Sequence, residues 1–170
     1  DIYTAFIVRT TEFLRSGGTI GCITNRTFLT LGAHESLRKE FLLSERPLRI
    51  LADLGSGVLD AAMVETACSI IDSSRADHNS IAEFIPLYML DNKQASLLQM
   101  RASPSIRRLA DFQRIPSYSI AYWLPENLLE LYSTCPPLEG GEYNVRVGLQ
   151  TSDDFRFARL AWEVDSTALA

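Results

Sequence analysis

The sequence predicts an α/β fold over residues 1–92 and a less regular extension over residues 93–170. Two observations carry this prediction. Helical and strand-like segments alternate in the first part, and several of its strand-like segments are short apolar runs. Over residues 103–118, two prolines and several arginines leave no regular period. We therefore expect a largely parallel sheet, covered on both faces, in the first part.

The first two elements are a helix and a strand. Over residues 2–16, Ile2, Phe6 and Phe13 recur at helical spacing and predict a face that packs inward. Gly17 and Gly18 then end the helix, because glycine tolerates the left-handed conformation found at helix ends. The apolar run TIGCIT, residues 19–24, predicts a fully buried strand.

A second helix is predicted over residues 27–43, and Pro47 lies beyond its end. Its inward face would consist of Phe28, Leu31, Leu37 and Phe41. Three extended segments follow, at residues 48–54, 66–71 and 81–90, and Pro86 in the last of them is typical of an edge or a bulge.

Asp91 is expected to cap a helix that continues to about Arg101. A short helix is predicted over residues 126–132, with Pro125 at its first turn.

Composition limits the classes of function. The 16 Lys and Arg residues against 21 Asp and Glu give a net charge of −5, which argues against a free-standing nucleic-acid binder but not against DNA binding by a longer protein. Cys22, Cys68 and Cys135 are widely spaced and typical of buried, reduced thiols, which suggests a cytoplasmic protein. Neither histidine lies near a cysteine, so no metal site is predicted. No apolar run approaches the roughly 18 residues of a membrane span.

The stretch LADLGSGVLDAA, residues 51–62, allows a nucleotide-binding interpretation. A strand followed by Gly55 and Gly57 resembles a phosphate-binding loop, and Asp72 would then contact a ribose. However, the chain from Gly57 to the next strand comprises only residues 57–65, and a parallel crossover needs about 10–12 residues. The short link therefore favours an antiparallel neighbour.

Four stretches together resemble N6-adenine-specific DNA methyltransferases, of the phage-exclusion (BREX) and fused restriction–methyltransferase type. The stretch DIYTAFIVRTTEFLRSGGTIGCIT is similar to the segment that follows the catalytic Asn-Pro-Pro-aromatic motif of that family. The others are LRKEFL (37–42), LADLGSGVLDAAMVETACSII (51–71) and GLQTSDDFRFARLAWEV (148–164). The resemblance implies the C-terminal half of a Rossmann-like class I methyltransferase sheet in residues 1–92. Residues 93–170 would then be linker helices and the start of a target-recognition region.

The resemblance also assigns site residues. Asp1, Tyr3 and Phe6 match a helix start that borders the adenine of S-adenosylmethionine. Thr24 and Asn25 fall at the end of a strand, where α/β sites gather. Leu59 matches a position in the link between the last two strands that often presents an aromatic ring to a flipped-out adenine. A leucine has no aromatic face, so either another aromatic residue substitutes or the base is handled differently.

The last stretch implies contact with DNA. Thr151, Arg156 and Arg159 would approach the phosphate backbone of double-stranded DNA, although the same stretch also suits an interdomain hinge. The sequence departs from the family pattern at Ser152, where glycine is usual, and at Phe155, where an acid is usual.

No catalytic residue is assigned. In TCPPLE, residues 134–139, Cys135 and Leu138 replace the acceptor and the aromatic residue of the amino-methyltransferase signature. The family's main cofactor loop and its Asn-Pro-Pro motif would lie upstream, so we expect this fragment alone to be inactive. The alternatives are a small nucleotide-binding domain that uses Gly55 and Gly57, and a non-catalytic docking module for other subunits of a defence complex.

Overall fold

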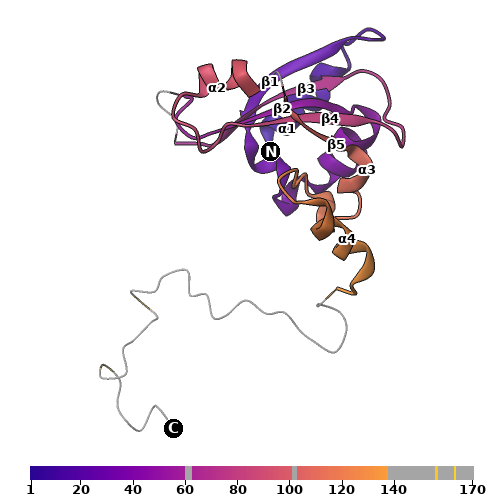
Figure 1. Ribbon diagram of the computed structural model, residues 1–170. Helices are drawn as coiled ribbons and strands as arrows, with labels where there is room; N and C mark the ends of the chain where they lie inside the picture. Colours follow the sequence, from indigo (N-terminus) through magenta and orange to yellow (C-terminus); the bar gives the residue numbers. More distant parts are fainter. Residues whose placement is uncertain (60–62, 101–102, 138–155, 157–162, 164–170) are drawn as a thin grey trace. The chain divides into compact units, whose positions relative to one another are not determined.

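The structure, a computed structural model, describes residues 1–59, 63–100, 103–137, 156 and 163 (Figure 1). The chain divides into two compact units, Asp1–Cys135 and Pro136–Ala170. All the helices and strands described below lie in the first unit. This unit extends beyond residue 92, the predicted end of the methyltransferase-like part of the chain. A functional division at residue 92 remains a prediction.

A five-stranded sheet with the order β1-β3-β2-β4-β5 forms the centre of the first unit (Figure 1). Its strands are β1 (Thr19–Asn25), β2 (Leu48–Gly55), β3 (Thr66–Asp72), β4 (Ile81–Pro86) and β5 (Ser105–Arg108). The first four lie where the sequence predicted extended segments. The expectation that Pro86 marks an edge or a bulge was wrong. Strand β4 pairs with both β2 and β5, its register with β2 runs without a shift, and the proline is its last residue.

The strand directions correct the expectation of a largely parallel sheet. β2 and β4 are parallel, whereas β3 is antiparallel to both β1 and β2, and β5 is antiparallel to β4. The antiparallel direction of β3 confirms the inference drawn from the short link after Gly57. A link of this length can return the chain beside its neighbour but cannot carry it back across the sheet.

The two faces of the sheet are covered unequally. The main core lies on one face, where Leu48, Leu51 and Phe84 pack with residues from the helices. On the other face, a small cluster of Ala52, Ile85 and Leu87 contacts Leu97 of α2 (Lys93–Met100). Figure 1 shows α2 and α3 (Leu109–Phe112) on opposite sides of the strands. The predicted cover on both faces is therefore only partial among the described residues.

The first helix, α1, is shorter than predicted and packs through a different face. It spans Ile2–Thr11 and buries Ile7 and Thr11, whereas Ile2, Phe6 and Phe13 are largely exposed. Because the helix ends at Thr11, Phe13 is not part of its periodic face. Strand β1 was also expected to be fully buried, but only Ile20 is, because β1 pairs with β3 alone among the described strands.

In place of the predicted continuous helix over residues 27–43, the structure has three separate helical segments. These are two 3₁₀ segments, η1 (Arg26–Leu29) and η2 (Gly32–His34), and a π-helix, η3 (Leu37–Glu45). Leu31, predicted to face inward, lies between the first two and is half-exposed. A continuous α-helix would have used the carbonyl groups of Phe28 and Leu31 within its own ladder.

Instead, those carbonyl groups accept hydrogen bonds from Arg38, whose side chain is completely buried. Its Nη1 donates to the oxygens of Phe28 (2.7 Å) and Leu31 (2.8 Å). Its Nη2 donates to the oxygen of Ser117 (2.7 Å), and its Nε donates to the same oxygen (3.0 Å). Ser117 has a positive φ of 56°. The guanidinium group therefore joins residues 28–31 to a turn far along the chain.

The remaining helices are short. η4 (Pro116–Tyr118) contains the strained turn, and α4 (Glu126–Thr134) follows Pro125 as predicted, two residues longer than expected. Asn92, rather than the predicted Asp91, caps α2, because its side-chain oxygen accepts a hydrogen bond from the Ala95 backbone nitrogen (3.1 Å).

Replacing Arg38 with methionine should lower the free energy of unfolding by about 3–5 kcal/mol, because three backbone carbonyl groups would lose a charged donor in the interior. Urea unfolding of the 170-residue chain measures the change. The neighbouring Lys39→Met is the control: its ammonium lies 5.1 Å from the Tyr118 ring centroid, and such a contact contributes about 1 kcal/mol at most near a surface. Equal stabilities for the two variants would contradict the structural role of Arg38.

Candidate functional site

The candidate site lies at the edge of the sheet where β1, β2 and β4 end. These strands point the same way, so Asn25, Gly55 and Pro86 reach one edge. The link between β2 and β3, residues 56–65, begins and ends there, because Gly55 and Asn25 are both paired with Thr66. In open α/β sheets, ligands bind outside the carboxyl ends of the parallel strands.

Asp53, near the end of β2, is the centre of this edge. Its side chain is completely inaccessible to solvent. Its Oδ2 accepts one hydrogen bond from Nη2 of Arg26 (2.7 Å) and another from the hydroxyl group of Tyr122 (2.8 Å). Arg26 also donates from Nη1 to Oε2 of Glu65 (3.0 Å), and its backbone nitrogen donates to the Glu65 carbonyl oxygen. One buried carboxylate thus joins the end of β1, the end of the link and a segment 69 residues further along.

The environment fixes the charges of these groups. Burial lowers the pKa of Arg26, but Asp53 and Glu65 outweigh it and hold that pKa above its usual value, so Arg26 is a cation. Burial raises the pKa of Asp53, against the opposing effects of Tyr122 and Arg26. Burial and the Asp53 carboxylate raise the pKa of Tyr122, so its hydroxyl group stays protonated and donates. The geometry is that of a salt bridge between Arg26 and Asp53, 2.7 Å long, with a neutral phenol bonded to the same carboxyl oxygen.

The three residues assigned to the substrate base all lie at this edge. Leu59 is 45% exposed in the link, which leaves β2 at Gly55 and returns at Thr66 beside the end of β1. The Oδ1 of Asn25 accepts a hydrogen bond from the Thr27 backbone nitrogen (2.8 Å) and thereby caps η1. The hydroxyl group of Thr24 is buried without a hydrogen-bond partner. Contact of these residues with a base remains a prediction.

The residues assigned to the cofactor lie at the start of α1. The hydroxyl group of Tyr3 is 3.0 Å from Nε2 of His34 and 3.4 Å from Oγ1 of Thr27, which brings the start of the helix toward the end of β1. Asp1 holds the N-cap position without a side-chain capping bond, and the Phe6 ring is largely exposed. The structure therefore connects Tyr3 to the candidate site through Thr27.

Two of the three residues assigned to DNA phosphates, Thr151 and Arg159, lie outside the described residues. Arg156 is described and is exposed. Their assignment stays a prediction.

The nucleotide-binding interpretation of Gly55 and Gly57 does not fit the topology. Both glycines have positive φ, 65° and 74°. However, the strand that follows them is antiparallel to β2, so no parallel crossover unit exists at this position. Asp72, the expected ribose ligand, lies at the opposite end of β3, where it pairs with Arg49.

Other reactive groups lie apart from this edge or form no cluster. Cys22, Cys68 and Cys135 are free thiols, but the first two are only half-buried and the third is exposed, contrary to the expectation of burial. Burial raises the pKa of Cys68.

In the described part of the chain, no group of three or more histidine, cysteine or acidic side chains is arranged to hold a metal ion. None of its helices combines the length and the apolar character needed to cross a membrane.

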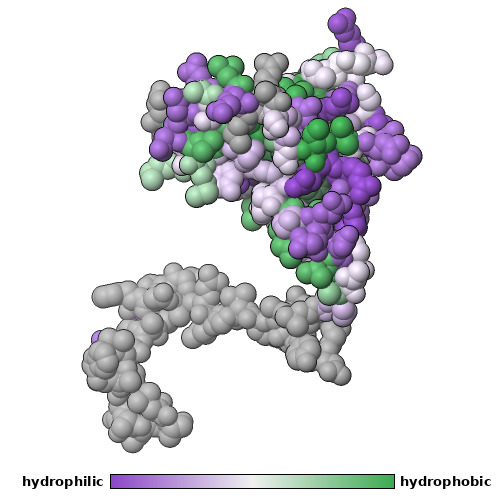
Figure 2. Space-filling view, in the orientation of Figure 1, coloured by the Kyte–Doolittle hydropathy of each residue, from purple (hydrophilic) through white to green (hydrophobic). Residues whose placement is uncertain are grey.

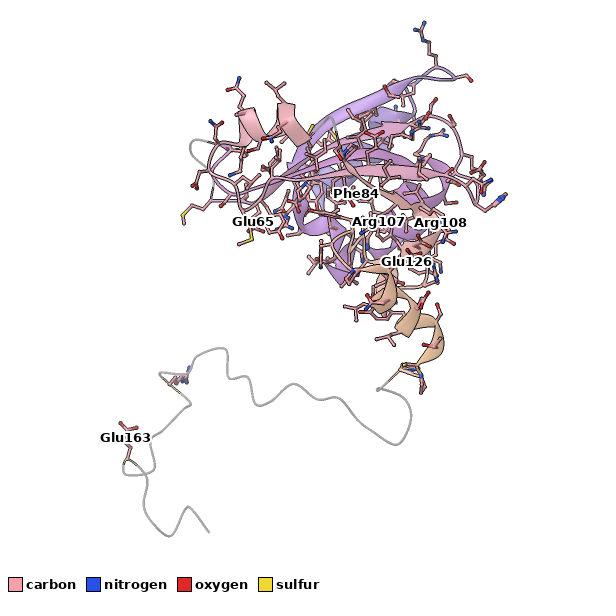
Figure 3. All side chains as sticks on the ribbon, viewed as in Figure 1. Glu65, Phe84, Arg107, Arg108, Glu126 and Glu163 are labelled. Atoms are coloured by element: carbon pink, nitrogen blue, oxygen red, sulfur yellow. The ribbon has the colours of Figure 1, made fainter. Side chains whose placement is uncertain are left out.

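A cavity of about 200 Å³ lies at the other end of β4, beside β5 and α4. Arg107, Arg108 and Glu126 line it, and Figure 3 shows them far along the strands from Glu65. Figure 2 shows that hydrophilic side chains cover most of the visible face around α3 and α4, with separate hydrophobic patches. This cavity is distinct from the candidate site.

Sequence reasoning missed the Arg26–Asp53–Tyr122 network. One signal was available, because Asp53 follows an apolar stretch of a predicted buried strand, and a buried carboxylate requires partners. Nothing in the sequence indicates that those partners are Arg26 and Tyr122, which only the fold brings together.

Comparison with solved structures relates the fold to one class of protein. A chain from a type I restriction–modification system aligns with a TM-score of 0.54 and 12% identity, over 78% of this chain and 35% of that one. The M protein of the type I restriction enzyme EcoKI aligns with a TM-score of 0.42 and 18% identity, over 51% of this chain and 20% of that one. The fold is thus shared with a component of restriction–modification systems. No protein-family model matches the sequence.

Among curated proteins, the chain is similar to the adenine-specific methyltransferase PglX of Lacticaseibacillus casei (strain Zhang). The identity is 23% over 175 residues, which covers 96% of this chain and 14% of PglX. The resemblance to adenine-specific methyltransferases of the restriction–modification and phage-exclusion type is thereby confirmed. The chain spans about a seventh of the length of this curated relative.

Lowering the pH should destabilise the chain through His34. Burial, the N-terminal ammonium group of this chain and Arg38 lower the pKa of His34 from its usual 6.5, so the folded chain favours the neutral ring between Tyr3 and Thr4. Below pH 6.5 the unfolded chain binds a proton that the folded chain does not, and the free energy of unfolding falls until the lowered pKa is reached. Unfolding in urea between pH 8 and 5 measures this.

His34→Gln should remove that part of the pH dependence, whereas substitution of the exposed His78 by glutamine should keep it. The same pH dependence in wild type and His34→Gln would contradict the assignment.

Tyr122→Phe should lower the free energy of unfolding by about 1–3 kcal/mol, because the buried Asp53 loses a hydrogen bond and keeps only Arg26 as a partner. The phenylalanine ring can still stack on Phe84, where the ring centroids are 4.8 Å apart. Chemical unfolding measures the loss. The matched control is Tyr132→Phe on the surface of α4, which should change stability by less than about 0.5 kcal/mol.

Proposed function

We propose that this chain is part of an S-adenosylmethionine-dependent, adenine-specific DNA methyltransferase of a restriction–modification or phage-exclusion system. The observation that carries the proposal is the arrangement of β1, β3 and β2, in which an antiparallel strand lies between two strands that point the same way. The last strands of a Rossmann-like class I methyltransferase sheet are expected to have this arrangement. Similarity to PglX over 96% of the chain supports the same conclusion.

In this proposal, the described residues form one side of the reaction site. S-adenosylmethionine supplies the methyl group that is transferred to the N6 amino group of adenine. The exposed ring of Phe6 and the start of α1 suit a border for the planar adenine of the cofactor, and Tyr3 connects that border to the end of β1. These residues offer no set of donors for the whole cofactor, so the main binding loop belongs to another part of the protein.

The end of β1 and the link after β2 would face the substrate base. A base must leave the duplex before its amino group can react. Asn25 and Leu59 lie at the edge that would receive it, and the Asp53–Arg26–Glu65 network holds both ends of that edge in place. The contribution of these residues is positioning, which alone can supply several kcal/mol of a reaction barrier.

Double-stranded DNA is the proposed partner, with other subunits of the defence system as further partners. Thr151, Arg156 and Arg159 would contact DNA phosphates, in a recognition region that starts within residues 93–170. Each phosphate contact that is lost should reduce the salt dependence of DNA binding by about one unit of slope.

The test is methylation by the full-length protein. With radiolabelled S-adenosylmethionine and genomic DNA that lacks the modification, we expect label in N6-methyladenine after nuclease digestion and chromatography. The 170-residue chain alone should neither methylate DNA nor bind the cofactor in calorimetric titration. If the full-length protein binds DNA but does not methylate it, the docking module would be favoured instead.

Leu59→Ala in the full-length protein should lower the methylation rate constant about 5- to 10-fold, because an apolar contact with the base is lost. Leu59→Phe should preserve or raise it. Leu128→Ala on α4 is the matched control, since the exposed fractions of Leu59 and Leu128 are 45% and 40%. Equal rates for Leu59→Ala and Leu128→Ala would remove Leu59 from the site.

A further inference from the structure

Tyr88 lies at the candidate site although no sequence pattern indicated it. It follows β4 by two residues and remains 39% exposed. Its backbone is fixed on one side, because the Leu87 nitrogen donates to the Asp53 oxygen (2.8 Å) and the Leu90 nitrogen donates to the Leu87 oxygen (3.1 Å). An aromatic side chain is therefore held beside the end of β2 with part of its surface open to solvent.

Gly55 allows Tyr88 to approach the link that carries Leu59. A Cβ atom at position 55 would lie 2.8 Å from both Cα and Cβ of Tyr88, closer than real side-chain contacts. Gly55 also has a φ of 65°, which side chains other than glycine rarely adopt. The start of the link and Tyr88 therefore touch through backbone atoms.

Arg26 holds the ring of Tyr88. The guanidinium carbon of Arg26 is 5.2 Å from the ring centroid, within the range of a cation–π contact. Arg26 is in turn bound by Asp53 and Glu65, at 2.7 and 3.0 Å. A pre-organised ring loses little conformational entropy when a ligand binds to it.

The charge of this cluster indicates the kind of ligand. The single positive charge of Arg26 is outweighed by the two carboxylates that it pairs with, so the cluster offers an aromatic surface without a net positive charge. A phosphate would be repelled by Asp53 and Glu65, whereas a neutral planar group would not. Extruded and single-stranded bases are planar and neutral, and they stack on aromatic side chains.

We propose that Tyr88, positioned by Arg26 and Gly55, stacks on a nucleobase at this edge and provides the aromatic surface that Leu59 lacks. This inference rests on the proposed function, because it takes DNA as the substrate. It adds a residue outside the link, on a segment that only the fold brings to the site.

The experiment measures binding of a single-stranded oligonucleotide containing 2-aminopurine to the full-length protein, because such a strand needs no base to leave a duplex. Stacking on tyrosine should quench the 2-aminopurine fluorescence. Tyr88→Leu should weaken binding about 5- to 100-fold and reduce the quenching. Tyr88→Phe keeps the ring and should bind like wild type, which separates stacking from a role of the hydroxyl group.

Tyr132→Leu is the matched control, since Tyr132 is 47% exposed on α4, and it should bind like wild type. Thermal unfolding of each variant checks that the fold is retained. If Tyr88→Leu folds and binds the oligonucleotide as tightly as wild type, or if Tyr88→Phe is as weak as Tyr88→Leu, the proposal is overturned. A wild-type protein that binds no oligonucleotide overturns it as well.

The methylation assay separates this proposal from the proposed function. A wild-type protein that binds the oligonucleotide through Tyr88 but does not methylate DNA supports base stacking and refutes the enzyme. A wild-type protein that methylates DNA, with the same Michaelis constant and rate constant in Tyr88→Leu, supports the enzyme and refutes base stacking.

Discussion

The buried carboxylate of Asp53 is the constraint on which the candidate site depends. A charge without solvent contact is tolerated only when other groups replace its hydration. Arg26 and Tyr122 do so in part, from distant parts of the chain, because both bond to Oδ2. The other oxygen, Oδ1, is buried without a hydrogen-bond partner among the described residues. The two bonds to Oδ2 fix the end of β1 against the end of β2 and hold Tyr122 beside them.

The same network determines what the site can present to a ligand. Arg26 forms ion pairs with Asp53 and Glu65, so its charge is already paired within the protein. Arg26 also contacts the ring of Tyr88 and orients it. Gly55 completes the arrangement by leaving room for the Tyr88 backbone. A site of this kind suits a neutral planar group better than an anion, which is what the proposed stacking of a base on Tyr88 requires.

The buried Arg38 performs a comparable role elsewhere in the fold, and it explains an error of sequence reasoning. The spacing of Phe28, Leu37 and Phe41 indicates one helix. However, Arg38 donates hydrogen bonds to carbonyl groups that such a helix would use for its own backbone hydrogen bonds. A periodic pattern records which residues are apolar, but it does not record which backbone groups a distant side chain will bind. The exposed Ile2 and Phe6 on α1 are a second case, because burial depends on what lies opposite the helix.

By itself, the sequence determined the positions of β1, β2, β3 and β4, the antiparallel direction of β3 and the resemblance to adenine methyltransferases. These properties are local, since apolar runs, turn residues and link length act over a few neighbouring residues. Only the tertiary structure decided that Arg26, Asp53, Tyr88 and Tyr122 form one cluster. Such contacts join residues far apart in the chain. They form because the fold buries a carboxylate, and a buried polar group needs hydrogen-bond donors from residues that the fold brings beside it.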